Sequence, residues 1–328
     1  MKDSGPPASE GFVNHNFRTP NWYVLLHGIA PPDSTLVLAP GVSISPLPTQ
    51  LTIFDLAAAG DSGLRAWAMV GQVAESCLCE IESAEDAAVA KGYNALNRAW
   101  LAAALLVLRG HGPLMPVACN SYSWAFIAAP HKRRSPAFLD AMRARGLNTD
   151  IYGAQNELPP FTGDLLDFHA RILQVRGMVR KSPTADDAEW CRAHFDAFNR
   201  LCADSEKFRF GLEAAMDWRY AKDHRIAIAR MWAGIEAILS VSSELVYRLS
   251  TFAAAVLSER GPDRTRMFKH VKALYSIRSK AVHGDSLKEE QLASGAGDSF
   301  KLLCDLLNYC VSQNRVPTEE DLIRALLE

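Results

Sequence analysis

Apolar residues in the C-terminal part of the chain recur at steps of three and four, the spacing of one face of an α-helix. Pro262, Gly284 and Pro317 interrupt this pattern at points where helices are expected to end. The pattern predicts successive helices near residues 185–203, 205–220, 222–240, 242–259, 264–283, 287–313 and 317–327. We therefore expect a helical domain over residues 183–328.

The N-terminal part has a different pattern. Residues 1–20 are rich in Pro, Gly, Ser and Asn and contain little to bury, which predicts a flexible tail. Short apolar runs rich in branched residues follow at 23–26 and 35–38, and apolar positions nearly alternate over 42–47. Turn-forming prolines separate these runs, so they predict the strands of a small antiparallel sheet.

Further elements are predicted between this sheet and the junction at residue 182. Helical spacing predicts helices at 64–82, 86–109 and 165–181, whereas 117–128 has strand character and 152–161 has the composition of a loop. We interpret residues 21–182 as an N-terminal α+β region whose role the sequence does not define. The expected fold is mainly α, with a C-terminal helical bundle preceded by an α-rich N-terminal region that contains a small β element.

Charge limits the ways in which the chain can bind nucleic acid. The 328 residues are 48% hydrophobic and 22% charged, and the formal net charge is −2. Such a chain has no global attraction to nucleic acid, so any contact with RNA needs a local basic patch. The run Lys132-Arg133-Arg134 fits either a solvated turn or a contact with a nucleic-acid backbone.

The cysteines and the motifs that the sequence lacks bear on metal, membrane and cofactor sites. Seven cysteines occur without a Cys-x-x-Cys pair, and Cys191 with His194 has no second pair at metal-site spacing, so we expect buried free thiols and no metal. The odd count and the lack of a secretory leader predict a cytoplasmic location. The apolar stretch Ala99–Leu108 is too short to span a bilayer, so no membrane contact is expected. The N-terminal region has no phosphate-binding glycine loop, no HExxH and no Ser–His–Asp signature, and no cofactor is expected.

The stretch with the most distinctive chemistry is Tyr275–Gly284, at the end of a predicted helix. Arg278 falls on the apolar stripe of that helix, where desolvating a charge is costly without a partner. One interpretation is structural: Arg278 completes an internal ion pair, and His283 favours the negative end of the helix dipole. The other is chemical: Arg278 binds a phosphate and His283 transfers a proton, as metal-free RNA cleavage requires.

The spacing of this pair is not sufficient by itself. Arg219 and His224 have the same separation, and Arg264 and His270 lie one residue further apart. The Arg219 copy lies in a polar, charged junction, which predicts a solvated surface. Only the Arg278 copy combines a preceding apolar helical run, an apolar neighbour of the histidine and an immediate glycine stop.

The segment Leu274–Gly284 resembles the signature of the HEPN superfamily, in particular its Apea-like branch. Arg230–Leu239, Glu244 and Arg248–Ser250 resemble the same branch, and the resemblance covers the C-terminal domain rather than the whole chain. Many members are metal-independent endoribonucleases with an Arg-x4-6-His pair. Others have lost cleavage, and members often dimerise so that two such motifs share one cleft.

Carried onto this sequence, the resemblance implies that Arg278 and His283 are the catalytic pair of an endoribonuclease. It implies a toxin or antiphage defence effector that cleaves single-stranded RNA, with a second copy and an antitoxin or defence-system protein as further partners. Ser279 stands where active members often carry Asn, Asp or His. The alternative is therefore an inactive HEPN module that binds RNA or nucleotide or scaffolds a partner. An unrelated helical interaction protein is the third hypothesis.

One further charge lies inside the predicted bundle. Glu236 belongs to a helix that is apolar nearly all round, so its carboxylate needs a cation or donors. Arg278 and Arg248 are both candidate partners. Pairing with Arg278 would orient the guanidinium toward a cleft, as supporting residues of a site do.

The neighbours of Arg278 are also candidates for substrate contact. Ser279 and Lys280 are placed to contact a phosphate and Tyr275 to stack on a base, although Lys280 also fits a solvated side chain and Tyr275 a core residue. Positions five apart on an ideal helix lie about 140° around its axis. Arg278 and His283 therefore point in different directions unless the helix loosens near its end. A two-fold partner would also supply the missing group, so we expect a homodimer whose interface uses this helix.

Overall fold

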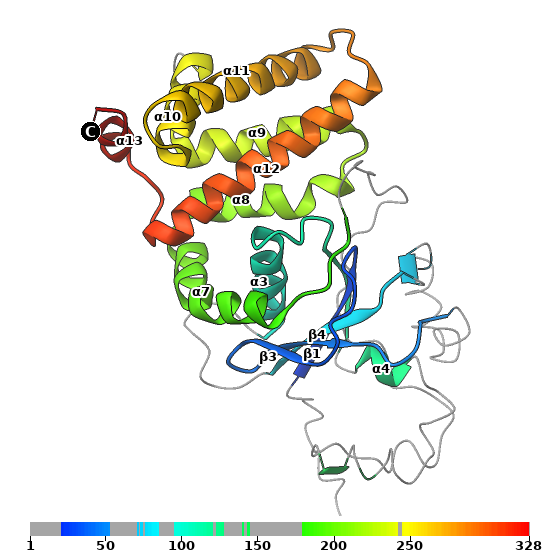
Figure 1. Cartoon of the computed structure of the whole chain (residues 1–328). Helices are drawn as coiled ribbons and strands as arrows, with labels where there is room; N and C mark the ends of the chain where they lie inside the picture. Colours follow the sequence, from blue (N-terminus) through cyan, green and yellow to red (C-terminus); the bar gives the residue numbers. More distant parts are fainter. Residues whose placement is uncertain are drawn as a thin grey trace, which may run out of the picture.

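The chain folds into an N-terminal antiparallel sheet, a helix that covers it, and a C-terminal group of helices (Figure 1). A computed structural model describes residues 21–52, 71, 73–74, 76–84, 95–120, 123–127, 140, 143–144, 179–241 and 245–327. The tail over 1–20, the loop over 152–161 and the basic run at 132–134 lie outside the described residues. The predicted helix at 165–181 also lies outside them, except for residues 179–181, which are not helical.

The predicted small antiparallel sheet is confirmed, and it has five strands among the described residues, in the order β2-β3-β4-β1-β5. Its strands are β1 (Asn21–His27), β2 (Leu36–Ala39), β3 (Val42–Pro46), β4 (Cys79–Ala84) and β5 (Met115–Asn120). Every neighbouring pair is antiparallel. The first three strands match the apolar runs found in the sequence, and each contains buried apolar side chains, such as Leu25, Leu38 and Ile44.

The predicted helix over 64–82 is wrong at its C-terminal end, because β4 lies there, between β1 and β3. Glu80 and Glu82 favour a helix by local propensity, but pairing with two neighbouring strands overrides this preference. Glu80 is buried, and it accepts hydrogen bonds from the Ser123 hydroxyl and the Trp124 amide, both at 2.6 Å. A buried carboxylate can be kept in a strand because these donors satisfy it.

The described part of the predicted helix at 86–109 is helical, as α3 (Ala95–Leu108). It packs against β1, β4 and β5 and lies between the sheet and the C-terminal helices (Figure 1). The predicted strand over 117–128 is correct to residue 120, but α4 (Trp124–Ile127) follows. The Ser123 hydroxyl accepts from the Ala125 amide at 3.1 Å and so favours the start of this short helix.

The helices predicted for the C-terminal domain are all present, with ends within a few residues of the expected positions. They are α7 (Ala185–Asp204), α8 (Glu206–Asp217) with a 3-10 turn at Trp218–Tyr220, α9 (His224–Leu239), α10 (Leu245–Leu257), α11 (Pro262–His283), α12 (Glu289–Gln313) and α13 (Glu319–Leu327). α9 contacts α8, α10, α11 and α12, so it is the central helix of this group. Its contact with α8 is close, because a Cβ at Gly234 would lie 3.1 Å from the Cα of Gly211.

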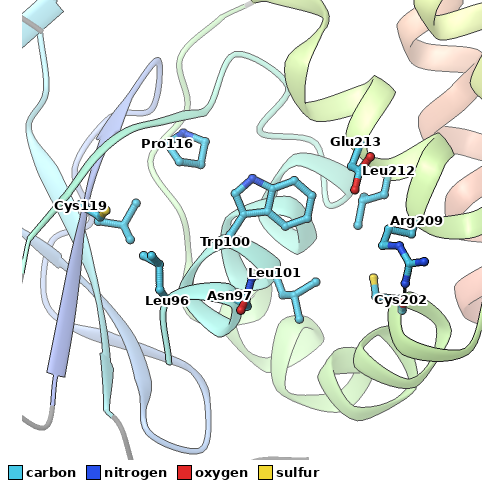
Figure 2. Close-up of a pocket in the computed structure, with 11 residues that line it drawn as sticks. Leu96, Asn97, Trp100, Leu101, Pro116, Cys119, Cys202, Arg209, Leu212 and Glu213 are labelled. Carbon is cyan, nitrogen blue, oxygen red and sulfur yellow. Dashed lines mark hydrogen bonds between the residues drawn. The ribbon is translucent and has the colours of Figure 1, made fainter. Parts of the chain in front are cut away.

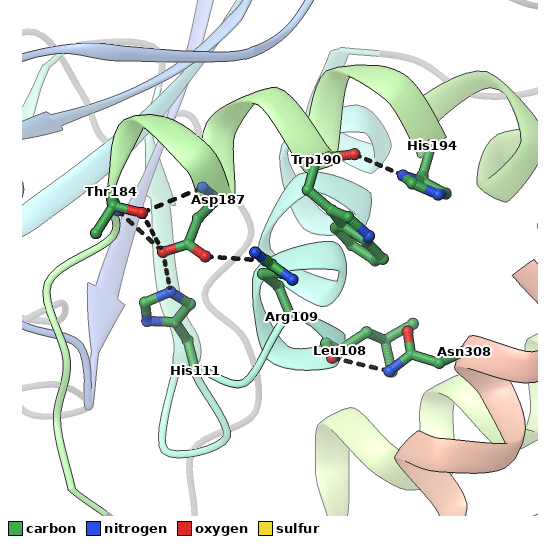
Figure 3. A network of polar contacts seen from close by, with 8 residues as sticks. All are labelled: Leu108, Arg109, His111, Thr184, Asp187, Trp190, His194 and Asn308. Atoms are coloured by element: carbon green, nitrogen blue, oxygen red, sulfur yellow. Dashed lines mark hydrogen bonds and ion pairs between the residues drawn. The ribbon is translucent and has the colours of Figure 1, made fainter. Parts of the chain in front are cut away.

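Polar contacts join the end of α3, the helix that covers the sheet, to α7 and α12 (Figure 3). Asp187, in the first turn of α7, closes a capping box with Thr184. Its carboxylate also accepts from Arg109 at 3.0 Å and pairs with the buried His111 at 3.2 Å, just beyond α3. The Asn308 amide of α12 donates to the Leu108 carbonyl at 2.9 Å. These contacts fix α3 against α7 and α12.

Asp187→Ala is expected to lower the free energy of unfolding by about 1–2 kcal/mol, since it removes the capping box and leaves the buried His111 without its partner. Burial alone would raise the pKa of Asp187, but hydrogen bonds from the Thr184 backbone, His111 and the Thr184 hydroxyl lower it overall. A lowered pKa in the folded state stabilises the protein above the ordinary Asp pKa of about 3.9, and the effect is lost as pH falls through the folded pKa.

Urea unfolding at pH 7 and pH 3 measures this effect, with Asp186→Ala as the matched control because Asp186 is an exposed neighbour in the same helical turn. The difference between wild type and Asp187→Ala should be smaller at pH 3. Equal unfolding midpoints for Asp187→Ala and Asp186→Ala at pH 7 would contradict the role given to Asp187.

Candidate functional site

Arg278 lies on the face of α11 that packs against α9, and Glu236 of α9 is its partner. Its Nη2 atom donates to Glu236 Oε1 at 3.0 Å, and the two side chains are 21% and 23% exposed. Of the two partners considered for Glu236, the structure shows Arg278, because Arg248 pairs with Glu319 of α13. The internal ion pair expected of a charge on an apolar stripe is therefore present.

Tyr275 and the core behind it hold the other side of the guanidinium. The Arg278 guanidinium carbon lies 5.3 Å from the centre of the Tyr275 ring, within the range of a cation–π contact. Tyr275 in turn meets Trp232 edge to face, with ring centres 5.3 Å apart, and Trp232 donates to the Ser299 hydroxyl at 3.0 Å. Tyr275 is buried, so it supports Arg278 from the core and does not offer an exposed ring for base stacking.

The C-terminus of α11 places His283 on the surface. His283 is the last residue of the helix, it is exposed, and its ring makes no hydrogen bond or ion pair with any described residue. Gly284 follows in the left-handed conformation, with φ of 78°, and its amide bonds back to the Lys280 carbonyl. The helix stop predicted at Gly284 is confirmed.

An arginine of α9 fixes this helix end, and the sequence analysis did not single it out. Arg225 donates through Nη1 to the Ala281 carbonyl at 3.0 Å and through Nη2 to the Asp285 carbonyl at 2.7 Å. These carbonyls lie at the end of α11, where helices leave acceptors unsatisfied. The only signal in the sequence was the need of a helix end for donors, which did not indicate a particular residue.

The remaining candidates beside Arg278 take different positions. Lys280 is exposed and Ser279 is half-buried, and neither side chain has a described hydrogen bond. Two apolar side chains near the helix end, Ile226 and Val282, are each 48% exposed. They follow Arg225 and Ala281, the two residues that are joined by a hydrogen bond. Polar and apolar side chains are therefore both accessible around His283.

The structure does not bring Arg278 and His283 together within one chain. α11 stays α-helical to its last residue, so the two side chains lie about 140° apart around its axis. Arg278 faces α9, whereas His283 faces the solvent. The helix does not loosen near its end, so one chain alone does not form a combined Arg278–His283 site.

The second Arg–His pair of the same spacing is not the solvated surface that was predicted. Arg219 and His224 are both buried. Arg219 donates to the Pro113 carbonyl at 2.5 Å, and His224 pairs with Glu289 at the start of α12 at 2.6 Å. Arg219 and His224 are buried because the segment that carries Pro113 and the start of α12 pack against them. Both residues have structural partners.

The cysteines behave as small core residues, and His194 of the candidate metal pair is held within its own helix. All seven cysteines are free and buried, as expected. His194 stacks on Trp190 and its Nδ1 donates to the Trp190 carbonyl at 2.8 Å. Over the described ranges, no three His, Cys, Asp or Glu side chains are grouped closely enough to hold a metal ion. In the same part of the chain, no helix has the length and hydrophobicity needed to cross a bilayer.

Comparisons with family models, curated proteins and solved structures gave no match for this chain.

Proposed function

We propose that the chain is a metal-independent endoribonuclease of HEPN type, a toxin or antiphage effector that cleaves single-stranded RNA. The observation that carries this proposal is the support of Arg278 by Glu236 and Tyr275, while His283 stays exposed at the end of the same helix. The described contacts use one of the five N–H donors of the Arg278 guanidinium. The resemblance of Leu274–Gly284 to the HEPN signature gives the reaction class.

The two side chains have complementary roles in this reaction. A ribose 2′-oxygen attacks the adjacent phosphorus and forms a new P–O bond, while the bond from phosphorus to the 5′-oxygen breaks. The 2′-hydroxyl loses a proton and the leaving 5′-oxygen gains one: His283 takes the first or gives the second, and solvent water exchanges the other. Arg278 stabilises the charge on the non-bridging oxygens. The products are a 2′,3′-cyclic phosphate and a 5′-hydroxyl. Glu236 is a positioning residue, since it fixes Arg278 without reaching the substrate.

A second copy completes the site in this proposal. The arginine of one chain and the histidine of the other would meet across a two-fold axis that passes close to the end of α11. The exposed Ile226 and Val282 provide apolar surface for such an interface, next to His283. Lys280 and Ser279 then lie at its edge, where they contact phosphates that flank the cleaved bond.

The expected result is cleavage of single-stranded RNA by the pure protein in the presence of EDTA, at the same rate as without it. Chelation should have no effect because the proton transfer and the charge stabilisation both come from side chains. End-group analysis of the fragments should show 5′-hydroxyl and 2′,3′-cyclic phosphate ends. A mixture of unrelated RNAs left intact at every protein concentration, or cleavage that EDTA stops, would sink the proposal.

One observation favours a second candidate, a HEPN module that binds RNA or nucleotide without cleaving it. The carboxylate of Glu236 neutralises much of the charge that Arg278 offers to a phosphate. Ser279 also departs from the residues that active members often carry. This candidate gives retention of labelled RNA on a filter with no new fragments, so the cleavage assay separates the two.

A further inference from the structure

A cavity of about 350 Å³ lies between the N-terminal sheet and the C-terminal helices. Figure 2 shows its three walls. The sheet contributes Pro116 and Cys119 from β5, α3 contributes Leu96 and Trp100, and α8 contributes Leu212. The cavity therefore touches both parts of the molecule at once.

This space is partly open to the surface, so it is a pocket that a small molecule can enter. The cavity is also within the range of small-molecule sites, which form preferentially where two structural units meet. The Trp100 indole reaches into the space between Pro116 and Leu212 (Figure 2). An apolar molecule against this ring would gain dispersion contacts with the apolar wall of the pocket.

The lining determines the kind of molecule that would fit. Most of the wall is apolar, so the body of the ligand is apolar, and a flat ring is favoured beside Trp100. Charged groups come from one side only: Arg209 and Glu213 lie one turn apart on α8, near Cys202 (Figure 2). A ligand with a single polar group would direct that group toward α8 and its rings toward the sheet.

We infer that this cavity binds a small aromatic molecule with one polar head group, held between α3, β5 and α8. The site shares no residue with the α9–α11 contact that holds Arg278. It therefore does not depend on the proposed nuclease function, and the two stand or fall separately.

The test uses the full chain and the fluorescent probe 8-anilino-1-naphthalenesulfonate, two aromatic groups with one sulfonate. Titration should show saturable binding with one probe per chain. Leu212→Trp fills the cavity with a larger ring and should weaken binding by at least about tenfold. Phe210→Trp is the matched control, because it adds tryptophan to the exposed face of the same helix and should leave binding unchanged.

Cys119→Phe fills the cavity from β5 and keeps the test valid if Leu212→Trp does not fold. Circular dichroism and the melting temperature identify the folded variants. Weaker binding in either folded cavity variant, with normal binding in Phe210→Trp, supports the site. Absence of saturable binding, or equal affinity in wild type and a folded cavity variant, overturns it.

Discussion

His283→Ala is expected to lower the rate of RNA cleavage by about 10²–10⁴-fold, the usual contribution of a positioned general acid or base. The imidazole is exposed and has no described partner, so its removal should leave the fold intact. The rate is measured on end-labelled single-stranded RNA in EDTA, with enzyme in excess over substrate. His270→Ala is the matched control, since His270 is another exposed histidine of α11 and lies six residues after Arg264. Undiminished cleavage by His283→Ala would remove His283 from the mechanism.

A mixed dimer tests whether two copies share the site. Arg278→Ala and His283→Ala chains are given different affinity tags, and only dimers that carry both tags are assayed. If Arg278 of one copy acts with His283 of the other, each mixed dimer has one intact site and about half of the wild-type rate returns. If both residues act within one chain, no intact site forms and the mixed dimer stays inactive. A shared site would explain why α11 points the two side chains apart.

Trp232→Ala is expected to lower the free energy of unfolding by about 3–5 kcal/mol, the cost of removing a large aromatic side chain from a core. Trp232 is fully buried on the central helix α9. The substitution removes its contact with Tyr275 and the hydrogen bond to Ser299, 3.0 Å long, and leaves that buried hydroxyl without its donor. Because Tyr275 also contacts Arg278, the substitution removes packing directly behind the candidate site.

Urea unfolding followed by far-ultraviolet circular dichroism measures this cost. Trp232→Phe keeps most of the ring volume and should cost less than Trp232→Ala, mainly through the hydrogen bond to Ser299. Tyr247→Ala is the control for loss of an aromatic side chain at the surface, since Tyr247 is 65% exposed, and it should change stability little. Similar midpoints for Trp232→Ala and Tyr247→Ala would show that the core around α9 is not packed as described.

The C-terminal helices could be predicted from the sequence because each buries one apolar face, and proline or glycine marks several of their ends. Local pattern was less informative in the N-terminal part. The local pattern predicts a helix over most of β4, and only pairing with its two neighbouring strands makes it a strand. α4 begins where Ser123 and Trp124 donate to the buried Glu80. In both places, residues distant in sequence decide the local conformation, and periodicity carries no information about them.

The candidate site was also predictable from the sequence only in part. The need of Arg278 for a buried partner followed from its place on an apolar stripe, but the choice between Arg278 and Arg248 as the partner of Glu236 required the packing of α9 on α11. The support from Arg225 depends on where a helix end lies in space, so no spacing in the sequence indicates it. The burial of Arg219 and His224 was missed because their covering groups come from other parts of the chain.

The close approach of Gly211 and Gly234 makes α8 and α9 a single stiff plate, because backbone meets backbone with no side chain between them to change rotamer and absorb strain. One edge of this plate borders the cavity beside the sheet, and the other carries Glu236. We therefore expect a displacement of α8 beside the cavity to move α9 with it, and so to move the carboxylate that anchors Arg278.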